Sequence, residues 1–258
     1  MTLLLLGGTG EAKALAQFCI DSGIDCIYSI AGLVRTPQLD CPINIGGFSQ
    51  SGGLNAFIKR ENISAIMDAT HPYAQKMSNQ AVLSGKQTGI PVWRYQRPAW
   101  HKTPADDWQE HDDWPALLAA IENYQSIFLS AGQPSESVLN VLSQYQKKGQ
   151  HQTLRTAVPC EHALPNNMDW IKAIGPFSWQ QELELMASRK IDALITKNSG
   201  GTATQEKLHV AQALGIEIHM LKRPALNPCD KEFNNLQTSK NHLVAWFNHQ
   251  ILKNISER

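Results

Sequence analysis

The stretch Thr2-Leu-Leu-Leu-Leu-Gly-Gly-Thr-Gly-Glu11 decides the fold class of this chain. It begins with a short apolar run that ends at Gly7-Gly8, as a buried parallel strand does. Residues 11–21 then carry apolar side chains at positions 12, 15, 16, 19 and 20, which is helical spacing, and Gly23 follows as a helix stop. A strand, a glycine turn and a helix in this order predict the start of a parallel α/β sheet.

The alternation of strands and helices continues along the chain. Residues 97–115 interrupt it with several prolines and tryptophans, and we interpret this segment as the crossover between two halves. Residues 227–238 are expected to form a loop. The pattern predicts an α/β protein with mainly parallel sheets, divided into domains 1–97 and 98–258. Further strands are predicted at residues 25–30, 64–68, 91–94, 126–130, 152–157, 169–174, 191–196 and 217–221, and helices at 54–60, 75–87, 137–147, 179–188, 202–214 and 239–252.

Composition and charge exclude several classes of protein. The 258 residues suffice for one large domain or two smaller ones, and 42% hydrophobic residues exclude a disordered chain. Lys+Arg and Asp+Glu number 23 each, so a general nucleic-acid binder is not expected. Five cysteines without a C-x-x-C pair predict neither a disulfide framework nor a metal site. Without a membrane-length apolar run or a signal peptide, we expect a soluble cytoplasmic protein.

The glycine turn is the first candidate binding site. Gly8, Thr9, Gly10 and Glu11 follow a predicted strand and open a predicted helix. Glycines let the backbone approach a pyrophosphate closely, and the N–H groups at a helix start bind anions. Lys13 stands where the dinucleotide fingerprint has its third glycine. The motif predicts nucleotide binding, with a plain tight turn as the alternative.

The end of the second predicted strand indicates which nucleotide would bind. An NAD site usually has an Asp or Glu here that binds the ribose hydroxyls, and residues 29–32 contain neither. Arg35 lies just beyond them and could pair with a 2′-phosphate. This pattern favours NADP, and a solvated surface arginine is the alternative.

Two further loops follow predicted strands and carry polar side chains. Thr70, His71 and Tyr73 lie where ligands bind in open α/β sheets, and His71 could also act as an acid. The second loop is Lys197-Asn198-Ser199-Gly200-Gly201, whose donors and glycines are typical of an anion-binding loop. The structural alternatives are a core histidine for the first loop and a polar turn for the second.

Several scattered cations could add to a site for an acidic ligand. Singly, each is expected to be a surface charge, whereas several converging on one cleft would suit a polycarboxylate. These cations are Arg94, Arg97, Arg155, Lys172 and Arg223.

Taken together, these segments resemble the precorrin-6A reductase family of corrinoid biosynthesis, including the cobalt-precorrin-6A reductases. The resemblance runs from residue 3 to about residue 224. DATHP and TKNSGG are its most specific segments. The segments that carry it are Gly7-Gly8-Thr9-Gly10-Glu11-Ala12, Gly46-Gly47-Phe48, Asp68-Ala69-Thr70-His71-Pro72-Tyr73-Ala74, Arg97-Pro98-Ala99-Trp100, Gly175-Pro176-Phe177, Thr196-Lys197-Asn198-Ser199-Gly200-Gly201 and Arg223-Pro224.

This chain departs from the family pattern at three points. Ile174 stands where the family often has an arginine before Gly-Pro-Phe. Ser49-Gln50 replace the last two glycines of the family's GGFGG. Leu33 replaces an arginine after the second strand, and Arg35 could substitute for it.

The resemblance implies two Rossmann-like α/β domains with an active cleft between them. It implies NADPH-dependent reduction of a double bond in precorrin-6A or cobalt-precorrin-6A, which are tetrapyrrole polycarboxylates. His71 and Lys197 would be the candidate catalytic residues, with no metal ligand, in a monomer or weak homo-oligomer. The cofactor would contact Gly8, Thr9, Gly10, Glu11, Arg35, Gly47, Thr70 and His71, and the substrate Tyr73, Lys197, Asn198, Ser199, Gly200 and Gly201.

Three other functions stay open on the sequence. An NADP-dependent reductase of a smaller substrate would usually carry a Tyr-x-x-x-Lys pair, and no tyrosine here has a lysine four residues later. A two-lobed α/β binding or sensor protein would hold a small anion without turnover. A nucleotide-sugar transferase would bind its nucleotide mainly in the second half.

Overall fold

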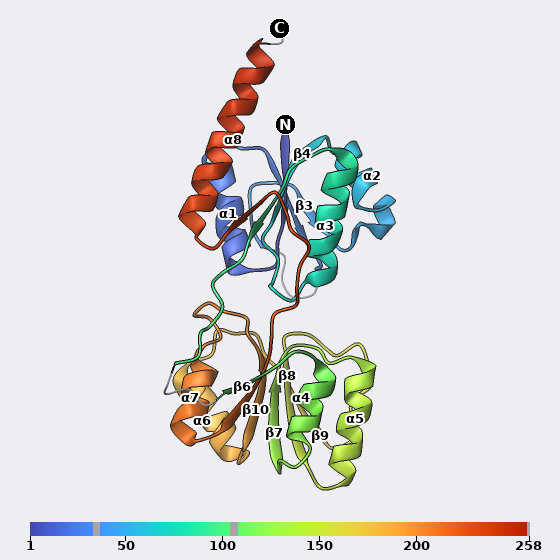
Figure 1. Cartoon of the computed structure of the whole chain (residues 1–258), viewed down its shortest axis with the longest axis vertical. Coiled ribbons are helices and arrows are strands. Elements are labelled where there is room, and N and C mark those ends of the chain that lie inside the picture. The colour runs from blue at the N-terminus through green and yellow to red at the C-terminus, as the bar shows by residue number, and fades with distance from the viewer. Residues whose placement is uncertain (33–36, 104–107, 257–258) are drawn as a thin grey trace. The chain divides into compact units, whose positions relative to one another are not determined.

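The computed structural model describes residues 1–32, 37–103 and 108–256. The chain forms two compact units. The first unit comprises Met1–Pro98 and Pro224–Arg258, and the second comprises Ala99–Arg223. In each unit, helices cover both faces of a six-stranded parallel sheet (Figure 1). The predicted α/β class with parallel sheets is therefore confirmed.

The sheet of the first unit has the strand order β12-β5-β4-β1-β2-β3. The order β3-β2-β1-β4-β5 is that of doubly wound sheets, in which ligands bind where the order reverses, here between β1 and β4. Its strands are β1 (Thr2–Leu6), β2 (Cys26–Ile30), β3 (Ile43–Ile45), β4 (Ile63–Asp68), β5 (Val92–Tyr95) and β12 (Lys231–Phe233). Its helices are α1 (Gly10–Asp21), the 3₁₀ helix η1 (Phe48–Ser51), α2 (Leu54–Arg60), α3 (Gln75–Thr88) and α8 (Leu236–Ser256).

The central strand β1 is covered on both faces. Leu3 and Leu5 belong to the core beneath α1 and α8, whereas Leu4 and Leu6 belong to the core beneath α2 and α3. None of these side chains is more than 2% exposed. Figure 1 shows the two helix pairs on opposite faces of the sheet. A continuous apolar run is the pattern of such a doubly covered strand, so the opening sequence fixes the layers.

The second unit has the strand order β6-β11-β10-β7-β8-β9, which repeats the reversal between β7 and β10. Helices α6 and α7 pack together on one face, and α4 and α5 on the other (Figure 1). Its strands are β6 (Trp108–His111), β7 (Ser126–Ser130), β8 (His151–Thr156), β9 (Met168–Lys172), β10 (Ala193–Lys197) and β11 (Glu217–Leu221). Its helices are α4 (Trp114–Ile121), α5 (Glu136–Lys147), α6 (Trp179–Ser188) and α7 (Glu206–Leu214).

The structure corrects three expectations from the sequence. Residues 224–258 were assigned to the second domain, but β12 pairs with β5, and Leu243 of α8 is fully buried in the core of the first unit. Residues 97–115 contain β6 and the start of α4, and residues 227–238 contain β12. β6, β12 and the equally unpredicted β3 are only three or four residues long, so they show too little alternation to predict.

Candidate functional site

Thr9 joins two loops at the point where the strand order of the first unit reverses. Its Oγ1 accepts a hydrogen bond from the Ala12 N–H (3.0 Å) and so caps α1. The same hydroxyl donates to the carbonyl of Ala69 (2.9 Å), directly after β4. The predicted glycine turn and the predicted loop after residue 68 therefore meet at one edge of this sheet.

The Tyr28 side chain packs against the glycine turn. The Gly8 N–H donates to the Tyr28 hydroxyl (3.1 Å), and a Cβ added at Gly7 would overlap the Tyr28 ring. Burial raises the pKa of Tyr28, which keeps its hydroxyl neutral. This contact could not be predicted from the sequence, because Tyr28 lies twenty residues from Gly8, in the middle of a strand.

The outer side of the turn is open. A Cβ added at Gly8 or Gly10 would meet no protein atom within 4 Å. Gly8 needs to be glycine for its backbone, since its φ is +106°. Gly10 has no positive φ and no close neighbour, although glycine weakens a helix. Its use at the start of α1 suits the close approach of a ligand phosphate to the backbone.

A buried ion-pair network supports the loop after β4. Asp68 and Arg94 are each 1% exposed, and Arg94 Nε lies 3.2 Å from Asp68 Oδ2. Arg94 Nη1 also donates to the carboxylate of Glu232 (2.7 Å) and to the carbonyl of Asn227 (3.1 Å). Asp68 Oδ1 accepts from the backbone N–H (3.2 Å) and the hydroxyl (2.7 Å) of Thr70. Thr70 is thus held in place by a network that reaches β12.

His71 and Tyr73 lie next to each other on this loop. His71 Nδ1 accepts a hydrogen bond from the Tyr73 N–H (3.3 Å), so the proton of the neutral imidazole lies on Nε2. Their ring centroids are 5.7 Å apart. The structure therefore brings His71, Tyr73 and Thr70 to the same sheet edge as the glycine turn.

The remaining predicted cofactor residues differ in their surroundings. Glu11 pairs with Arg97 (Oε1–Nη1, 3.2 Å), which offsets the repulsion its carboxylate would exert on a phosphate. Gly47 precedes η1 and has ordinary backbone angles. Arg35 lies outside the described residues.

The predicted anion-binding loop of the second unit is fixed by two neighbouring residues. Asn198 accepts from the Trp100 N–H (2.8 Å) and donates to the Trp100 carbonyl (3.0 Å), so its amide binds protein backbone. Arg223 donates through Nε to the Asn198 carbonyl (2.9 Å) and through Nη2 to the Ser199 carbonyl (3.2 Å). These contacts hold the backbone of the loop, which has a positive φ at Gly200 and Gly201.

Lys197 ends β10 and reaches toward the turn after β7. A Cβ added at Gly132 would lie 3.7 Å from Lys197 Nζ. Burial lowers the pKa of the Lys197 ammonium. A half-buried ammonium at the carboxyl end of a central strand can bind an anion that approaches this edge.

Two of the scattered cations are not surface charges, contrary to the sequence-based expectation. Arg94 is buried in its network with Asp68, and Arg155 is 8% exposed in a bidentate pair with Glu182 (2.7 and 3.1 Å). Arg155 also stacks on Phe177, with its Cζ 3.8 Å from the ring centroid. A sequence does not reveal such partners, because they come from other elements of the fold.

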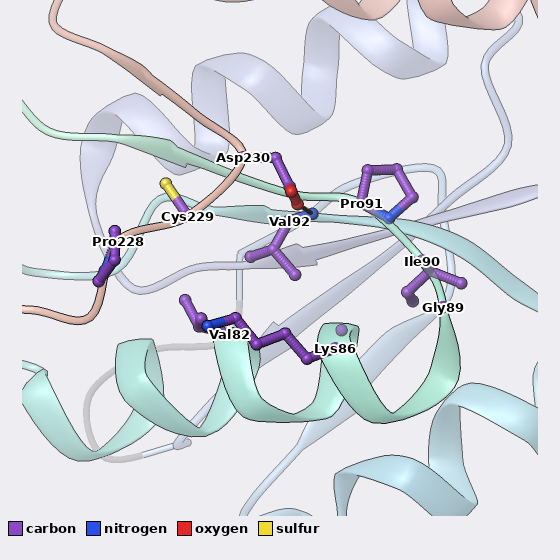
Figure 2. Close-up of a pocket in the computed structure, with 10 residues that line it drawn as sticks. Val82, Lys86, Gly89, Ile90, Pro91, Val92, Pro228, Cys229 and Asp230 are labelled. Carbon is purple, nitrogen blue, oxygen red and sulfur yellow. Dashed lines mark hydrogen bonds between the residues drawn. The ribbon is translucent and has the colours of Figure 1, made fainter.

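A surface pocket of about 400 Å³ in the first unit lies away from these residues. Figure 2 shows Val82 and Lys86 of α3 facing Pro91, Val92 and the segment 228–230 across it. Pro91 precedes β5, so the pocket is at the amino ends of the strands, whereas the glycine turn follows a carboxyl end. It contains none of the predicted site residues and carries no argument about function.

Two properties of the described residues complete the description of the site. No group of three or more His, Cys, Asp or Glu side chains in this part of the chain could hold a metal ion. Within the same ranges, no helix is both long enough and apolar enough to cross a bilayer.

The fold and the first-unit site define a class: a two-unit α/β protein with a doubly wound sheet and a capped, open glycine turn of the nucleotide-binding type. The family model "Precorrin-6x reductase CbiJ/CobK" matches residues 2–247. This chain belongs to that family.

Individual relatives agree with the family match. The precorrin-6A reductase of Rhodococcus erythropolis is 34% identical over 95% of this chain and 96% of its own length. The cobalt-precorrin-6A reductase of Priestia megaterium is 25% identical over 87% and 91%. A solved structure of CobK precorrin-6A reductase has a TM-score of 0.83 and 33% identity, covering 95% of this chain and 96% of the other. The predicted family is thereby confirmed.

Proposed function

We propose that this chain reduces precorrin-6A with NADPH during cobalamin biosynthesis. The observation that carries the proposal is its membership of the precorrin-6x reductase family over nearly the whole chain, in the fold of a CobK precorrin-6A reductase. The open glycine turn at the reversal point of the first sheet adds the feature that a nicotinamide dinucleotide requires. Reduced nicotinamide supplies the hydride.

The first unit would bind the dinucleotide. The N–H groups of Thr9 and Gly10 would hold the pyrophosphate, and Glu11 would accept from a ribose hydroxyl. Gly8, whose own N–H donates to Tyr28, would let the pyrophosphate approach the backbone because it has no side chain. Gly47 would lie beside the adenosine half. Thr70 and His71 would line the nicotinamide, because Thr9 holds their loop beside the turn. The network of Asp68 and Arg94 fixes that loop before the cofactor binds.

Arg35 would distinguish NADPH from NADH by pairing with the 2′-phosphate. The Arg35→Ala variant should bind NADPH about tenfold more weakly and NADH unchanged, since only one charge-assisted contact is lost. Fluorescence titration with both nucleotides measures this difference. Equal loss of both affinities would instead indicate a general defect of the turn.

The second unit would bind acidic side chains of the tetrapyrrole. Lys197 supplies a cation, and Gly200 and Gly201 supply backbone N–H groups in a loop with positive φ angles. Ser199 would contribute its hydroxyl, because its N–H donates to the Lys197 carbonyl (2.7 Å). Asn198 would contribute indirectly: its amide is hydrogen-bonded to the Trp100 backbone and so holds this loop in place. Tyr73 would meet the macrocycle from the first unit. His71 and Lys197 are the candidate donors of the proton that reduction consumes.

We favour the metal-free substrate over its cobalt form. Relatives that act on precorrin-6A are 34–35% identical to this chain, compared with 25% for the cobalt-precorrin-6A reductase of Priestia megaterium. An anaerobic assay with NADPH and each substrate in turn tests this choice. Nicotinamide oxidation with precorrin-6A alone is the expected result, whereas oxidation with neither substrate would refute the reductase proposal.

The alternative of a binding or sensor protein makes a different prediction in the same assay. It would bind a tetrapyrrole or an anion without oxidising NADPH. We place the protein in the cytoplasm as a monomer or weak homo-oligomer, and size-exclusion chromatography at two concentrations checks the oligomeric state.

A further inference from the structure

Lys207 of α7 is a buried cation that the proposed function does not use. The residue is 4% exposed, and its Nζ donates to Ser130 Oγ (3.2 Å) and, at 3.5 Å, to the Ser130 carbonyl. Among the described residues, no ion pair joins it to a carboxylate. The acid whose charge reaches it is Glu182, and both oxygens of Glu182 accept from Arg155. Burying an ammonium whose hydrogen bonds go to Ser130 costs folding free energy unless a nearby anion balances its charge.

Ser130 places this cation at the carboxyl edge of the second sheet. Ser130 is the last residue of β7 and is half-buried, so its hydroxyl lies at the surface end of the strand. Thr196 lies beside it in register on β10. The Thr196 Oγ1 is buried without a hydrogen-bond partner. Two hydroxyls, one of them without a partner, therefore lie side by side at this end of the sheet, and the Lys207 ammonium donates to the other.

A second ammonium lies on the other side of the same turn. The turn after Ser130 passes through Gly132, and Lys197 Nζ is close to where a Gly132 Cβ would be. With Arg155 included, three cations and one acid, Glu182, surround the end of β7. This excess of positive charge is suited to a carboxylate that approaches the edge.

The Lys207 ammonium titrates near physiological pH. Burial, and after it the positive charge of Arg155, lowers the pKa of Lys207 to about 7, and the charge of Glu182 opposes this shift. The groups that face it are Ser130 on β7, Arg155 on β8 and Glu182 on α6. Lys207 is therefore partly neutral at pH 7.5, and an anion nearby would draw a proton onto it.

We propose that Ser130 donates its hydroxyl proton in a hydrogen bond to a carboxylate of the tetrapyrrole, and that Lys207 takes up a proton behind it as the substrate binds. Lys207 is a positioning residue, since it acts through Ser130 and does not touch the substrate. The chain of contacts is carboxylate, Ser130 hydroxyl and Lys207 ammonium, each donating to the one before. This inference rests on the proposed function, because the acidic ligand is the precorrin.

The test is calorimetry of precorrin-6A binding without NADPH, under anaerobic conditions, in two buffers with different ionisation enthalpies. A group of pKa about 7 is about one quarter protonated at pH 7.5, so binding should take up roughly 0.7 of a proton there and below about 0.1 at pH 6. Lys207→Met should abolish this uptake. Met fills a similar volume, and replacing a buried charge by an apolar side chain leaves folding intact.

Two further variants separate the proposal from a structural role. Ser130→Ala removes the contact but keeps Lys207, and should raise KM for precorrin-6A about tenfold with kcat unchanged. Ser126→Ala removes a hydroxyl at the opposite end of β7, which bonds the Arg189 carbonyl (2.9 Å), and should leave proton uptake and KM unchanged.

The outcomes distinguish this inference from the proposed function. A wild-type protein that reduces precorrin-6A, paired with a Lys207→Met variant that takes up the same proton fraction, overturns the inference alone. Wild-type binding without proton uptake at pH 7.5 overturns it as well. A wild-type protein that neither binds nor reduces precorrin-6A overturns both.

Discussion

The two units have the same strand order around their central strands but different loops after them. In the first unit, β1 is followed by a glycine turn that offers backbone N–H groups, and its buried charges are balanced by the network of Asp68 and Arg94. In the second unit, β7 and β10 are followed by a turn and a loop flanked by Lys197 and Lys207. Both edges have groups that suit anions, but the first offers backbone N–H dipoles and the second offers cations. A phosphate can sit on backbone N–H groups, whereas several flexible carboxylates need distributed charge.

The units also differ in how they obtain the sixth strand of the sheet. The second unit takes β6 from the chain that leads into it, and the first unit takes β12 from the chain that returns to it. The return begins directly after Arg223, which donates to the backbone of the predicted anion-binding loop. The segment that completes the first sheet is thus covalently continuous with a residue of the second-unit site.

The largest effect is expected where each unit buries an arginine. Arg94→Met leaves Asp68 buried without its cation, and Arg155→Met does the same to Glu182, so each should lower the free energy of unfolding by about 3–5 kcal/mol. Urea denaturation measures the loss. Glu232→Gln is the control, because that carboxylate is 61% exposed and should cost below about 1 kcal/mol. A small loss in only one unit would show that its network is dispensable.

A second prediction tests whether the second unit binds the substrate through its cations. Lys197→Ala should raise KM for precorrin-6A by about ten- to a hundredfold, since a charge-assisted contact is lost, while the dissociation constant for NADPH stays unchanged. Steady-state kinetics and nucleotide titration measure the two effects separately. A fall in kcat with KM unchanged would contradict carboxylate binding and would make Lys197 the proton donor.

Local patterns predicted the fold class and the sheet edges at which the candidate site residues lie. The glycine turn at residues 7–10 and the polar loops that begin at the ends of β4 and β10 each follow a buried strand, so their positions at sheet edges follow from the alternation alone. The parallel α/β class and the family were predicted with them. The return of residues 224–258 was not, because β12 has only three residues, and its partner β5 lies far back in the sequence.

Long-range partners account for what the sequence could not predict. Tyr28 is an ordinary strand residue by its pattern, and only the fold brings its hydroxyl to Gly8. Arg94 and Arg155 read as surface charges because their acids come from other elements. Lys207 lies in a helix where a solvated lysine is usual, and its burial depends on α6 and β7. The sequence identifies a side chain, but the packing of the fold determines its pKa and its partners.

A third prediction sharpens the comparison at the glycine turn. Gly10→Ala should raise the free energy of unfolding by about 0.4–1 kcal/mol, because alanine favours a helix and its Cβ meets no protein atom. The same Cβ should raise the dissociation constant for NADPH about tenfold by displacing the phosphate. Gln17→Ala, on the exposed side of α1, is the control and should leave NADPH binding unchanged. A stabilised protein with normal NADPH affinity would show that the open side of the turn holds no ligand.

The smallest expected effect is a pH dependence of stability that comes from two stacked histidines of the second unit. In the second unit, His111 Nε2 lies 3.0 Å from His219 Nδ1, and burial lowers the pKa of both imidazoles. The unfolded chain then binds more protons near its ordinary histidine pKa of about 6.5, so stability is present above that pH and declines as the pH falls through it. His219→Gln keeps a hydrogen-bonding side chain that does not titrate and should flatten this decline, as measured by urea denaturation between pH 7.5 and 5. Burial also lowers the pKa of His242 in the first unit, so some slope should remain in the variant. An unchanged slope in His219→Gln would show that His219 does not contribute to it and would leave His111 and His242 as its source.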